Sequence, residues 1–123
     1  MRSDESAEMY LETILLLLEE GPNVRPVDVA RKSGYSKPSV SRAMGLLFNR
    51  GMIQYDSNGN IHLTEDGYAL ASKILDRHRL LTKALMLLGV SEEIAADDAC
   101  RIEHVISDES IDAIRSKINQ SNP

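Results

Sequence analysis

The stretch that decides the fold runs from Pro26 to Leu63 and reads PVDVARKSGYSKPSVSRAMGLLFNRGMIQYDSNGNIHL. Its first half carries apolar residues at helical spacing on both sides of Gly34. Pro26 and Pro38 fall where a helix can begin, because the missing N–H of proline costs nothing in a first turn. Ser36 is a favourable N-cap for the second segment. Two short helices joined by a turn that contains glycine are therefore predicted.

The second half of this stretch changes from helical spacing to alternation. Apolar and polar residues alternate over 53–55 and again over 61–63, which predicts two short strands. Asn58-Gly59 lies between them and favours a tight hairpin turn whose two central residues both have positive φ. A hairpin directly after two such helices is the wing of a winged helix-turn-helix, and we predict that motif here.

The flanking sequence predicts further helices around this motif. Apolar spacing indicates a helix over 6–20, before the motif, and a long helix that Thr64 caps and Gly89 closes. Ser91 and Ser107 are N-caps for two more helices. The expected fold is mainly α, with a winged helix-turn-helix domain over 1–70 and a helical domain over 71–123.

The composition of the 123-residue chain suits one or two small folding units. Hydrophobic residues make up 42% and aromatic residues only 4%, which favours helices packed through aliphatic side chains. Cys100 is the single cysteine, so an internal disulfide is excluded and a cytoplasmic location is expected. The longest apolar run, 14–18, is too short to span a bilayer, and no membrane partner is expected.

The net charge of −5 by itself argues against a nucleic-acid partner, but the charges are unevenly distributed. Residues 24–50 carry six basic side chains against one acidic, whereas residues 91–123 carry three basic against eight acidic. A basic segment on an acidic body is the electrostatic footprint of a DNA-binding protein. It is also compatible with an ordinary solvated face, so charge alone does not decide.

The second helix of a helix-turn-helix lies in the DNA major groove with its N-terminal residues facing the base edges. Arg42 is the best candidate for reading a base, because its planar fork matches the two acceptors of guanine. The serines at this end suit phosphates. An ordinary surface helix is the alternative, which the order helix, turn, helix, hairpin disfavours. The predicted DNA-contacting residues are Ser36, Lys37, Ser39, Ser41 and Arg42.

A second set of residues predicts a metal site. Cys100, Glu103 and His104 stand at positions i, i+3 and i+4, so a helix would present all three on one face. Thiolate, carboxylate and imidazole are all ligands of transition metals. A polar cluster satisfied within the protein is the alternative interpretation.

One helix rarely completes a coordination sphere, so further ligands are expected elsewhere. Met9 and Glu12 stand at i and i+3 on the first helix, and His78 lies on the apolar stripe of the long helix. Each has a plainer interpretation, as a core methionine, a solvated acid and a core histidine. Taken together they can supply up to two metal sites.

Several of these segments occur together in one known family. The stretches are 98–105 (DACRIEHV), 6–12 (SAEMYLE), 36–41 (SKPSVS), 63–67 (LTEDG) and 77–81 (RHRLL), the first being the most specific. In these stretches, and over nearly its whole length, the chain resembles the diphtheria toxin repressor family of iron- and manganese-dependent repressors. The resemblance implies a homodimer joined through its C-terminal helices, palindromic operators and control of metal uptake.

The resemblance also implies a ligand set. Met9, Cys100, Glu103 and His104 match the primary, activating site of the iron-sensing branch. Soft sulfur ligands favour Fe(II) over Mn(II), although other divalent metals should also bind in vitro. His78 matches a second-site ligand in both branches, and we expect a possible second site to be built from Glu12, His78 and a shared Glu103.

The chain departs from the family pattern at several points. Glu12 resembles the manganese branch instead of the iron branch. Thr82 and Ala96 stand where iron-type members carry further second-site ligands, so a second site must be built differently. The last predicted helix ends near residue 118, so we expect the short form without the SH3-like domain of larger members.

The expected function is that of a repressor, not an enzyme, because no partnered general base and no glycine-rich loop are evident. The expected mechanism is that one metal ion binds both the first helix and the segment carrying Cys100. In the homodimer this would fix the distance between the two DNA-reading helices. A metal-independent winged-helix regulator that responds to a small organic ligand is the main alternative. A metalloenzyme and a pure dimerisation or metal-storage module are the other two.

Overall fold

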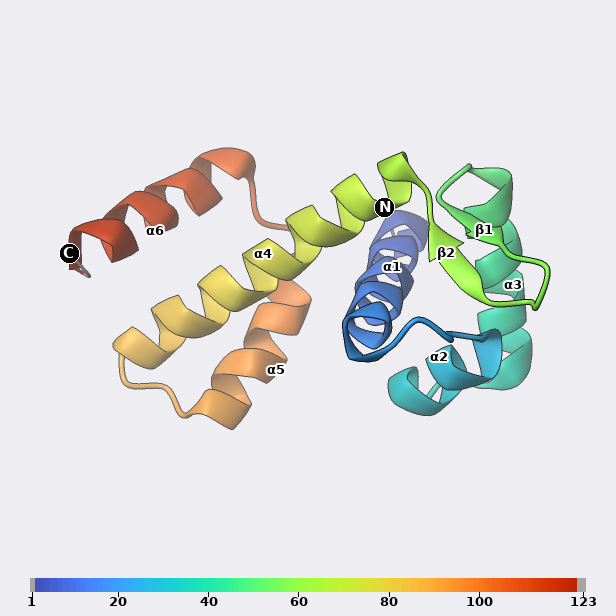
Figure 1. Ribbon diagram of the computed structural model, residues 1–123. Coiled ribbons are helices and arrows are strands. Elements are labelled where there is room, and N and C mark those ends of the chain that lie inside the picture. The colour runs from blue at the N-terminus through green and yellow to red at the C-terminus, as the bar shows by residue number, and fades with distance from the viewer. Residues whose placement is uncertain (1, 122–123) are drawn as a thin grey trace. The chain divides into compact units, whose positions relative to one another are not determined.

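The computed structural model describes residues 2–121, with side chains for residues 6–120. The chain divides into two compact units, one extending to Ser72 and the other starting at Lys73, with one long helix beginning in the first unit and continuing in the second. The mainly helical architecture is confirmed, and the winged helix-turn-helix is present (Figure 1). The elements are α1 (Arg2–Glu20), α2 (Pro26–Ser33), α3 (Lys37–Asn49), β1 (Ile53–Tyr55), β2 (Ile61–Leu63), α4 (Glu65–Leu87), α5 (Glu92–Ile102) and α6 (Asp108–Ser121).

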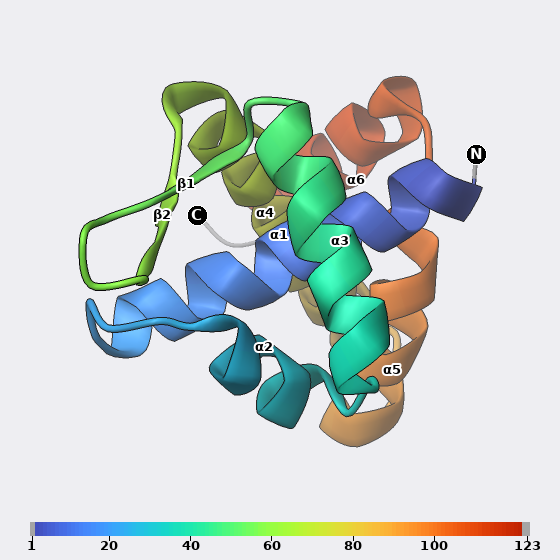
Figure 2. The ribbon, with the colours of Figure 1, turned by 90° about the vertical axis from the view of Figure 1, so that its right-hand side faces the viewer.

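The first unit packs α1, α2 and α3 around an aliphatic core, and α3 crosses α1 (Figure 2). The buried residues follow the predicted helical stripes, with Leu46 as an exception because its side chain is exposed on α3. No helix of the described residues is both long enough and apolar enough to cross a membrane. The core includes Leu11, Ile14, Val29, Val40, Met44, Leu47, Ile53 and Ile61.

Local hydrogen bonds and backbone geometry fix both ends of α2 and the start of α3. The backbone N–H of Arg25 donates to the Asp28 carboxylate at 2.9 Å, which caps the start of α2. Gly34 ends α2 with φ +78° and donates its N–H to the Ala30 carbonyl, a left-handed conformation that glycine adopts without a steric penalty. Ser36 then accepts the Ser39 N–H as the N-cap of α3.

The hairpin lies where the sequence predicts it, but its turn is of a different type. Tyr55 pairs with Ile61 in β1–β2, and the Gly59 N–H donates to the Asp56 carbonyl. Gly59 has φ +82°, whereas no residue other than glycine in the described chain has positive φ. The turn is therefore a three-residue loop in which only its last residue is left-handed, and the expected tight turn with two left-handed residues is wrong.

Asp56 holds this loop together. Its Oδ1 accepts the backbone N–H groups of Asn58 and Asn60, each at 2.9 Å. Its Oδ2 lies 3.0 Å from Nε2 of His62 on β2. The side-chain contact supplied by His62, followed by the backbone N–H of Asn60, stabilises the charged carboxylate and lowers the pKa of Asp56 from 3.8 to about 2.

We expect the wing turn to loosen as the pH falls from about 4 to about 2. A lowered pKa means that the charged carboxylate favours the folded turn, and this contribution is present above the ordinary pKa and lost below the folded one. NMR shifts of the Asn58 and Asn60 amides should titrate with a midpoint near 2. In Asp56→Asn the same amides should show no such titration, and a wild-type midpoint near 4 would contradict the assignment.

The start of α4 is locked against the turn that follows α3. The Thr64 hydroxyl accepts the Gly67 N–H at 3.0 Å and donates to the Gly51 carbonyl at 2.6 Å. The Thr64 N–H also donates to the carbonyl of Met52. Gly67 is needed because a Cβ there would lie 1.9 Å from the Met52 carbonyl oxygen. This contact gives a physical reason for Thr64 and Gly67 in the 63–67 stretch.

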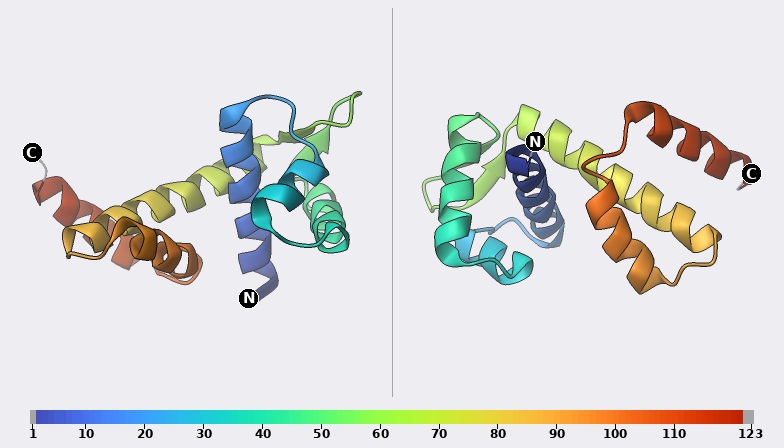
Figure 3. Two further views of the ribbon diagram at one scale, coloured as in Figure 1. Left: turned by 90° about the horizontal axis from the view of Figure 1, so that it is seen from below. Right: turned by 180° about the vertical axis from the view of Figure 1, so that it is seen from behind.

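The second unit consists of the remainder of α4 with α5 and α6, and α4 lies between the other two helices (Figure 3). One cluster of buried residues joins the three helices: Leu81 from α4, Ala99 from α5 and Ile111 from α6. Leu88, which the sequence predicts as part of the apolar stripe of α4, is exposed together with Leu87. Part of the apolar surface at the end of α4 is therefore uncovered in the described chain.

Candidate DNA-reading face and metal centre

The predicted DNA-reading residues occupy the N-terminal half of α3. Ser36, Lys37, Ser41 and Arg42 are exposed, and Ser39 is partly buried. The Ser36 hydroxyl donates to Oγ of Ser39 at 2.9 Å. Arg42 donates to the same Ser39 oxygen from Nη2 at 3.4 Å. The two serines are therefore engaged in the cap, and the basic groups that this end of α3 exposes come from Lys37 and Arg42.

Arg25 supports the wing, a role that the sequence analysis missed. Its Nη2 donates to the backbone carbonyl of Asn58 at 2.6 Å, which joins the start of α2 to the hairpin turn. The partner is a main-chain atom 33 residues away, so no local pattern indicates this contact. In the sequence, Arg25 stands out only as one of the six basic residues of the segment 24–50.

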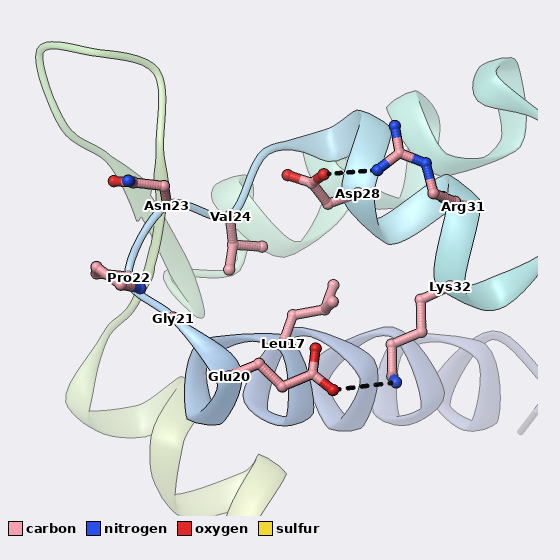
Figure 4. A pocket seen from close by; sticks show the side chains of 9 residues that line it. All are labelled: Leu17, Glu20, Gly21, Pro22, Asn23, Val24, Asp28, Arg31 and Lys32. Carbon is pink, nitrogen blue, oxygen red and sulfur yellow. Dashed lines mark hydrogen bonds and ion pairs between the residues drawn. The ribbon is translucent and has the colours of Figure 1, made fainter.

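A hollow of about 490 Å³ lies between the end of α1, the loop that follows it and α2 (Figure 4). Lys32 Nζ lies 3.9 Å from Glu20 Oε1, and Arg31 Nη1 lies 3.3 Å from Asp28 Oδ1. Opposite charges are thus paired around it, and we assign no ligand to this hollow. Its lining residues are Leu17, Glu20, Gly21, Pro22, Asn23, Val24, Asp28, Arg31 and Lys32.

Met9 and Glu12, the candidate ligands of the first unit, both lie in α1. The Tyr35 hydroxyl donates to the Met9 sulfur at 3.4 Å, and the Tyr35 ring packs against Tyr10 with centroids 5.8 Å apart. Burial is the main cause that raises the pKa of Tyr10. The candidate sulfur ligand therefore contacts the turn that immediately precedes the reading helix.

Three candidate ligands of the second unit come together around one carboxylate. Glu103 Oε2 lies 2.8 Å from His78 Nδ1, and Glu103 Oε1 lies 3.3 Å from His104 Nε2. The Glu103 side chain is 0% exposed and that of His104 is 7% exposed. A carboxylate is costly to bury unless it is paired, hydrogen-bonded or coordinated to a metal, so this cluster is the strongest chemical feature of the unit.

The local backbone differs from the expected single helical face. The α5 helix ends at Ile102, Glu103 is its C-cap residue, and His104 lies in the turn that follows. The Glu103 N–H still donates to the Ala99 carbonyl at 2.9 Å. Cys100 lies within α5 and is exposed. The expectation that one helix carries Cys100, Glu103 and His104 is therefore corrected, because only Cys100 lies inside it.

Residues 4–61 match the family described as iron dependent repressor, N-terminal DNA binding domain. Residues 64–122 match the family described as iron dependent repressor, metal binding and dimerisation domain. The transcriptional regulator MntR of Escherichia coli O6:H1 is 37% identical over 111 residues, which is 90% of this chain and 72% of MntR. The chain belongs to the diphtheria toxin repressor family. The resemblance noted in the sequence is confirmed.

Two more relatives place the chain within this family of metal-dependent repressors. The diphtheria toxin repressor of Corynebacterium diphtheriae is 34% identical over 106 residues, which is 85% of this chain and 47% of that protein. A manganese-dependent transcriptional repressor solved in complex with manganese superposes with a TM-score of 0.84 at 28% identity, covering 92% of this chain and 52% of that one. The chain thus spans about half the length of these two relatives.

The family implies a metal ion, and the donor atoms of the second unit fit one. Two ligands that each bind an ion at about 2.1 Å lie roughly 3.0 Å apart in octahedral geometry and about 3.4 Å apart in tetrahedral geometry. The two imidazole nitrogens lie 2.8 and 3.3 Å from the oxygens of Glu103, close to these spacings. Imidazole and carboxylate are ligands that Fe(II) and Mn(II) accept. The chemistry of His78, Glu103 and His104 is therefore compatible with a family metal site.

Proposed function

We propose that this chain is a metal-activated repressor that binds a palindromic DNA operator as a homodimer when loaded with Fe(II) or Mn(II), and so controls metal uptake in the cytoplasm. In this proposal residues 1–70 read DNA, and residues 71–123 bind metal and dimerise. The observation that carries it is the buried Glu103 carboxylate between two imidazoles. That cluster lies in the segment that matches a metal binding and dimerisation domain.

The proposed primary ligands are Met9, Cys100, Glu103 and His104, and the chemistry of the donor set supports them. Glu12 and His78 are the proposed ligands of a second site that shares Glu103. The Thr82 hydroxyl donates to the His78 carbonyl at 2.7 Å, which supports the expectation that Thr82 does not take the place of a ligand. A divalent cation supplies a common centre for the side chains that bind it.

We propose that the DNA-reading helix α3 responds to metal binding through α1. Met9 contacts Tyr35, which lies directly before the N-cap residue of α3. An ordered α1 would therefore stabilise the turn from which the reading helix starts. In a dimer, the two α3 helices must lie about 34 Å apart to enter successive major grooves of one operator. The metal response therefore depends on how rigidly each DNA-binding domain is held.

The proposed dimer surface is the apolar end of α4. Leu87 is 58% exposed and Leu88 is 81% exposed, and exposed apolar patches of this kind mark protein contacts. They border a groove of about 340 Å³ in the second unit. The residues that line this groove are Ala84, Leu87, Leu88, Ile114, Lys117 and Ile118.

The test measures operator affinity with and without metal. A preferred duplex is first selected from random DNA with protein loaded anaerobically with Fe(II) or Mn(II), and its affinity is then measured by fluorescence anisotropy with metal and with chelator. We expect the affinity to fall about 5- to 150-fold in chelator, as for a coupling of about 1–3 kcal/mol. Equal affinities would favour the metal-independent regulator, and no preferred duplex would leave a metal-storage or dimerisation module.

Arg42→Ala should relax base preference at one position in each half-site and weaken binding there by about 1–3 kcal/mol. Arg31→Ala is the matched control, because Arg31 lies on α2, outside the reading helix. Because Arg31 is paired with Asp28 and is not among the predicted DNA-contacting residues, this control should leave the base preference unchanged. Repeating the random-DNA selection with both variants distinguishes the two effects. An even loss with Arg42→Ala would reassign Arg42 to phosphate contact.

A further inference from the structure

Arg77 is a buried cation whose described partners all lie in the segment that carries the candidate ligands. It immediately precedes His78 on α4, and its side chain is only 9% exposed. Its Nη1 donates to the backbone carbonyl of Glu103 at 3.3 Å and to that of Ile106 at 2.9 Å. Its Nη2 pairs with the carboxylate of Asp108, the first residue of α6.

These contacts fix the main chain of Glu103 on both sides. Its N–H donates to the Ala99 carbonyl within α5, and its carbonyl accepts from Arg77. Its side chain meets the imidazole of His78, the neighbour of Arg77 in sequence. Adjacent residues of α4 thus hold the backbone and the carboxylate of the same glutamate.

We propose that Arg77 is a positioning residue of the metal site, which presets Glu103 and His104 for the ion without binding it. This inference rests on the proposed function, because it gives Arg77 a task only where Glu103 is a ligand. Partners that orient metal ligands typically change metal affinity 10- to 100-fold when they are removed. Such an effect requires that the ligand segment lose its fixed position when the guanidinium is absent.

Lysine can replace this arrangement only in part. A guanidinium presents several N–H groups in a rigid planar fork, whereas an ammonium is a single charge on a flexible stem. Lys73 illustrates the difference, because its Nζ already lies 3.7 Å from the Asp108 carboxylate, but its described contact does not extend to either carbonyl. When Arg77 is removed, Asp108 therefore keeps a cation nearby, whereas the carbonyls of Glu103 and Ile106 lose the hydrogen bonds from Arg77.

The experiment compares Arg77→Met and Arg77→Lys with Arg115→Met. Arg115 also joins α6 to α4, through Asp76 at 2.7 Å, but this pair is solvent-accessible and does not involve the ligand segment. Mn²⁺ affinity is measured by calorimetry on the full chain. Hydrogen exchange of the amides of Glu103, Val105 and Ile106 is measured without metal, and urea unfolding gives the stability of each variant.

We expect Arg77→Met to bind Mn²⁺ 10- to 100-fold more weakly than the wild type and Arg77→Lys to recover only part of this loss. The three amides should exchange faster in metal-free Arg77→Met. Arg115→Met should change neither readout, even if it lowers stability. If Arg77 had a purely structural role, Arg77→Met would lower stability but would bind Mn²⁺ as tightly as Arg115→Met.

A wild-type chain that binds no Mn²⁺ or Fe²⁺ would overturn the proposed function and this inference with it. A wild type that binds, with Arg77→Met binding equally well and exchanging at the same rate, would overturn only the inference. If Arg77→Met does not fold, Asp108→Asn tests the same clamp, because it removes the carboxylate that orients Nη2. This variant should bind Mn²⁺ about 3- to 10-fold more weakly, and unchanged affinity would refute the role of Arg77.

Discussion

Glu103→Gln is expected to lower Mn²⁺ affinity about 100-fold or more, because the Glu103 carboxylate contacts both imidazoles. Even indirect partners of ligands contribute 10- to 100-fold. Glutamine keeps the size of the side chain, and its amide can accept from one imidazole and donate to the other. The metal-free fold should therefore be retained, while the negative charge that attracts the cation is lost.

Thermal or urea unfolding at a Mn²⁺ concentration 100 times the wild-type Kd measures this loss. The wild type should gain about 2.7 kcal/mol of unfolding free energy from the metal, and a variant with 100-fold weaker affinity only about 0.4 kcal/mol. Asp97→Asn is the matched control, because Asp97 is an exposed acid on α5. It should keep the full gain. A full gain in Glu103→Gln as well would remove Glu103 from the ligand set.

Gly67→Ala is expected to destabilise the first unit by roughly 2–4 kcal/mol. The added methyl group would lie 1.9 Å from the Met52 carbonyl oxygen and 2.9 Å from its carbon, so the backbone must move. That movement strains a well-packed contact and breaks the hydrogen bond from the Thr64 N–H to Met52, whose loss costs about 1–3 kcal/mol. The helical preference of alanine offsets only about 1 kcal/mol of this.

Gly45→Ala provides the control, because Gly45 lies within α3 and a Cβ there would have nothing within 4 Å. This variant should stabilise the protein by about 0.5–1 kcal/mol. Urea unfolding followed by circular dichroism compares the two variants at one temperature. Similar free energies for both would mean that the start of α4 does not pack tightly against Met52.

The winged helix-turn-helix could be predicted because its signals are local. Pro26, Gly34 and Ser36 each act through backbone geometry within a few residues, and the structure uses them as expected. The type of hairpin turn could not be predicted from Asn58-Gly59. The Asp56 carboxylate satisfies the turn N–H groups in a three-residue loop, an option that the dipeptide does not reveal.

The end of α5 shows the limit of sequence patterns at the candidate site. The i, i+3, i+4 spacing of Cys100, Glu103 and His104 assumes a continuous helix, but the helix stops at Ile102. The carbonyls of Glu103 and Ile106 bind Arg77, which lies 26 and 29 residues away. A partner so distant in sequence leaves no periodic signal, so neither the helix end nor the role of Arg77 could be predicted.

Exposed apolar residues show a second limit of prediction from the sequence. Leu88 fits the apolar stripe of α4, but it is 81% exposed. Periodicity shows which face of a helix is apolar, but not whether the same chain or another one covers it. Along this stripe Leu81 is buried and Leu85 is partly buried, whereas Leu88 is exposed.

The three-residue loop of the wing has a consequence for how this protein can change over evolutionary time. Within the described structure, the loop is held by the Asp56 side chain, by the left-handed Gly59 and by the Asn58 carbonyl that receives Arg25. The side chains of Ser57 and Asn58 take no part in those contacts and are exposed. The side chains at these two positions can therefore vary without disturbing the loop, while folding constrains their neighbours.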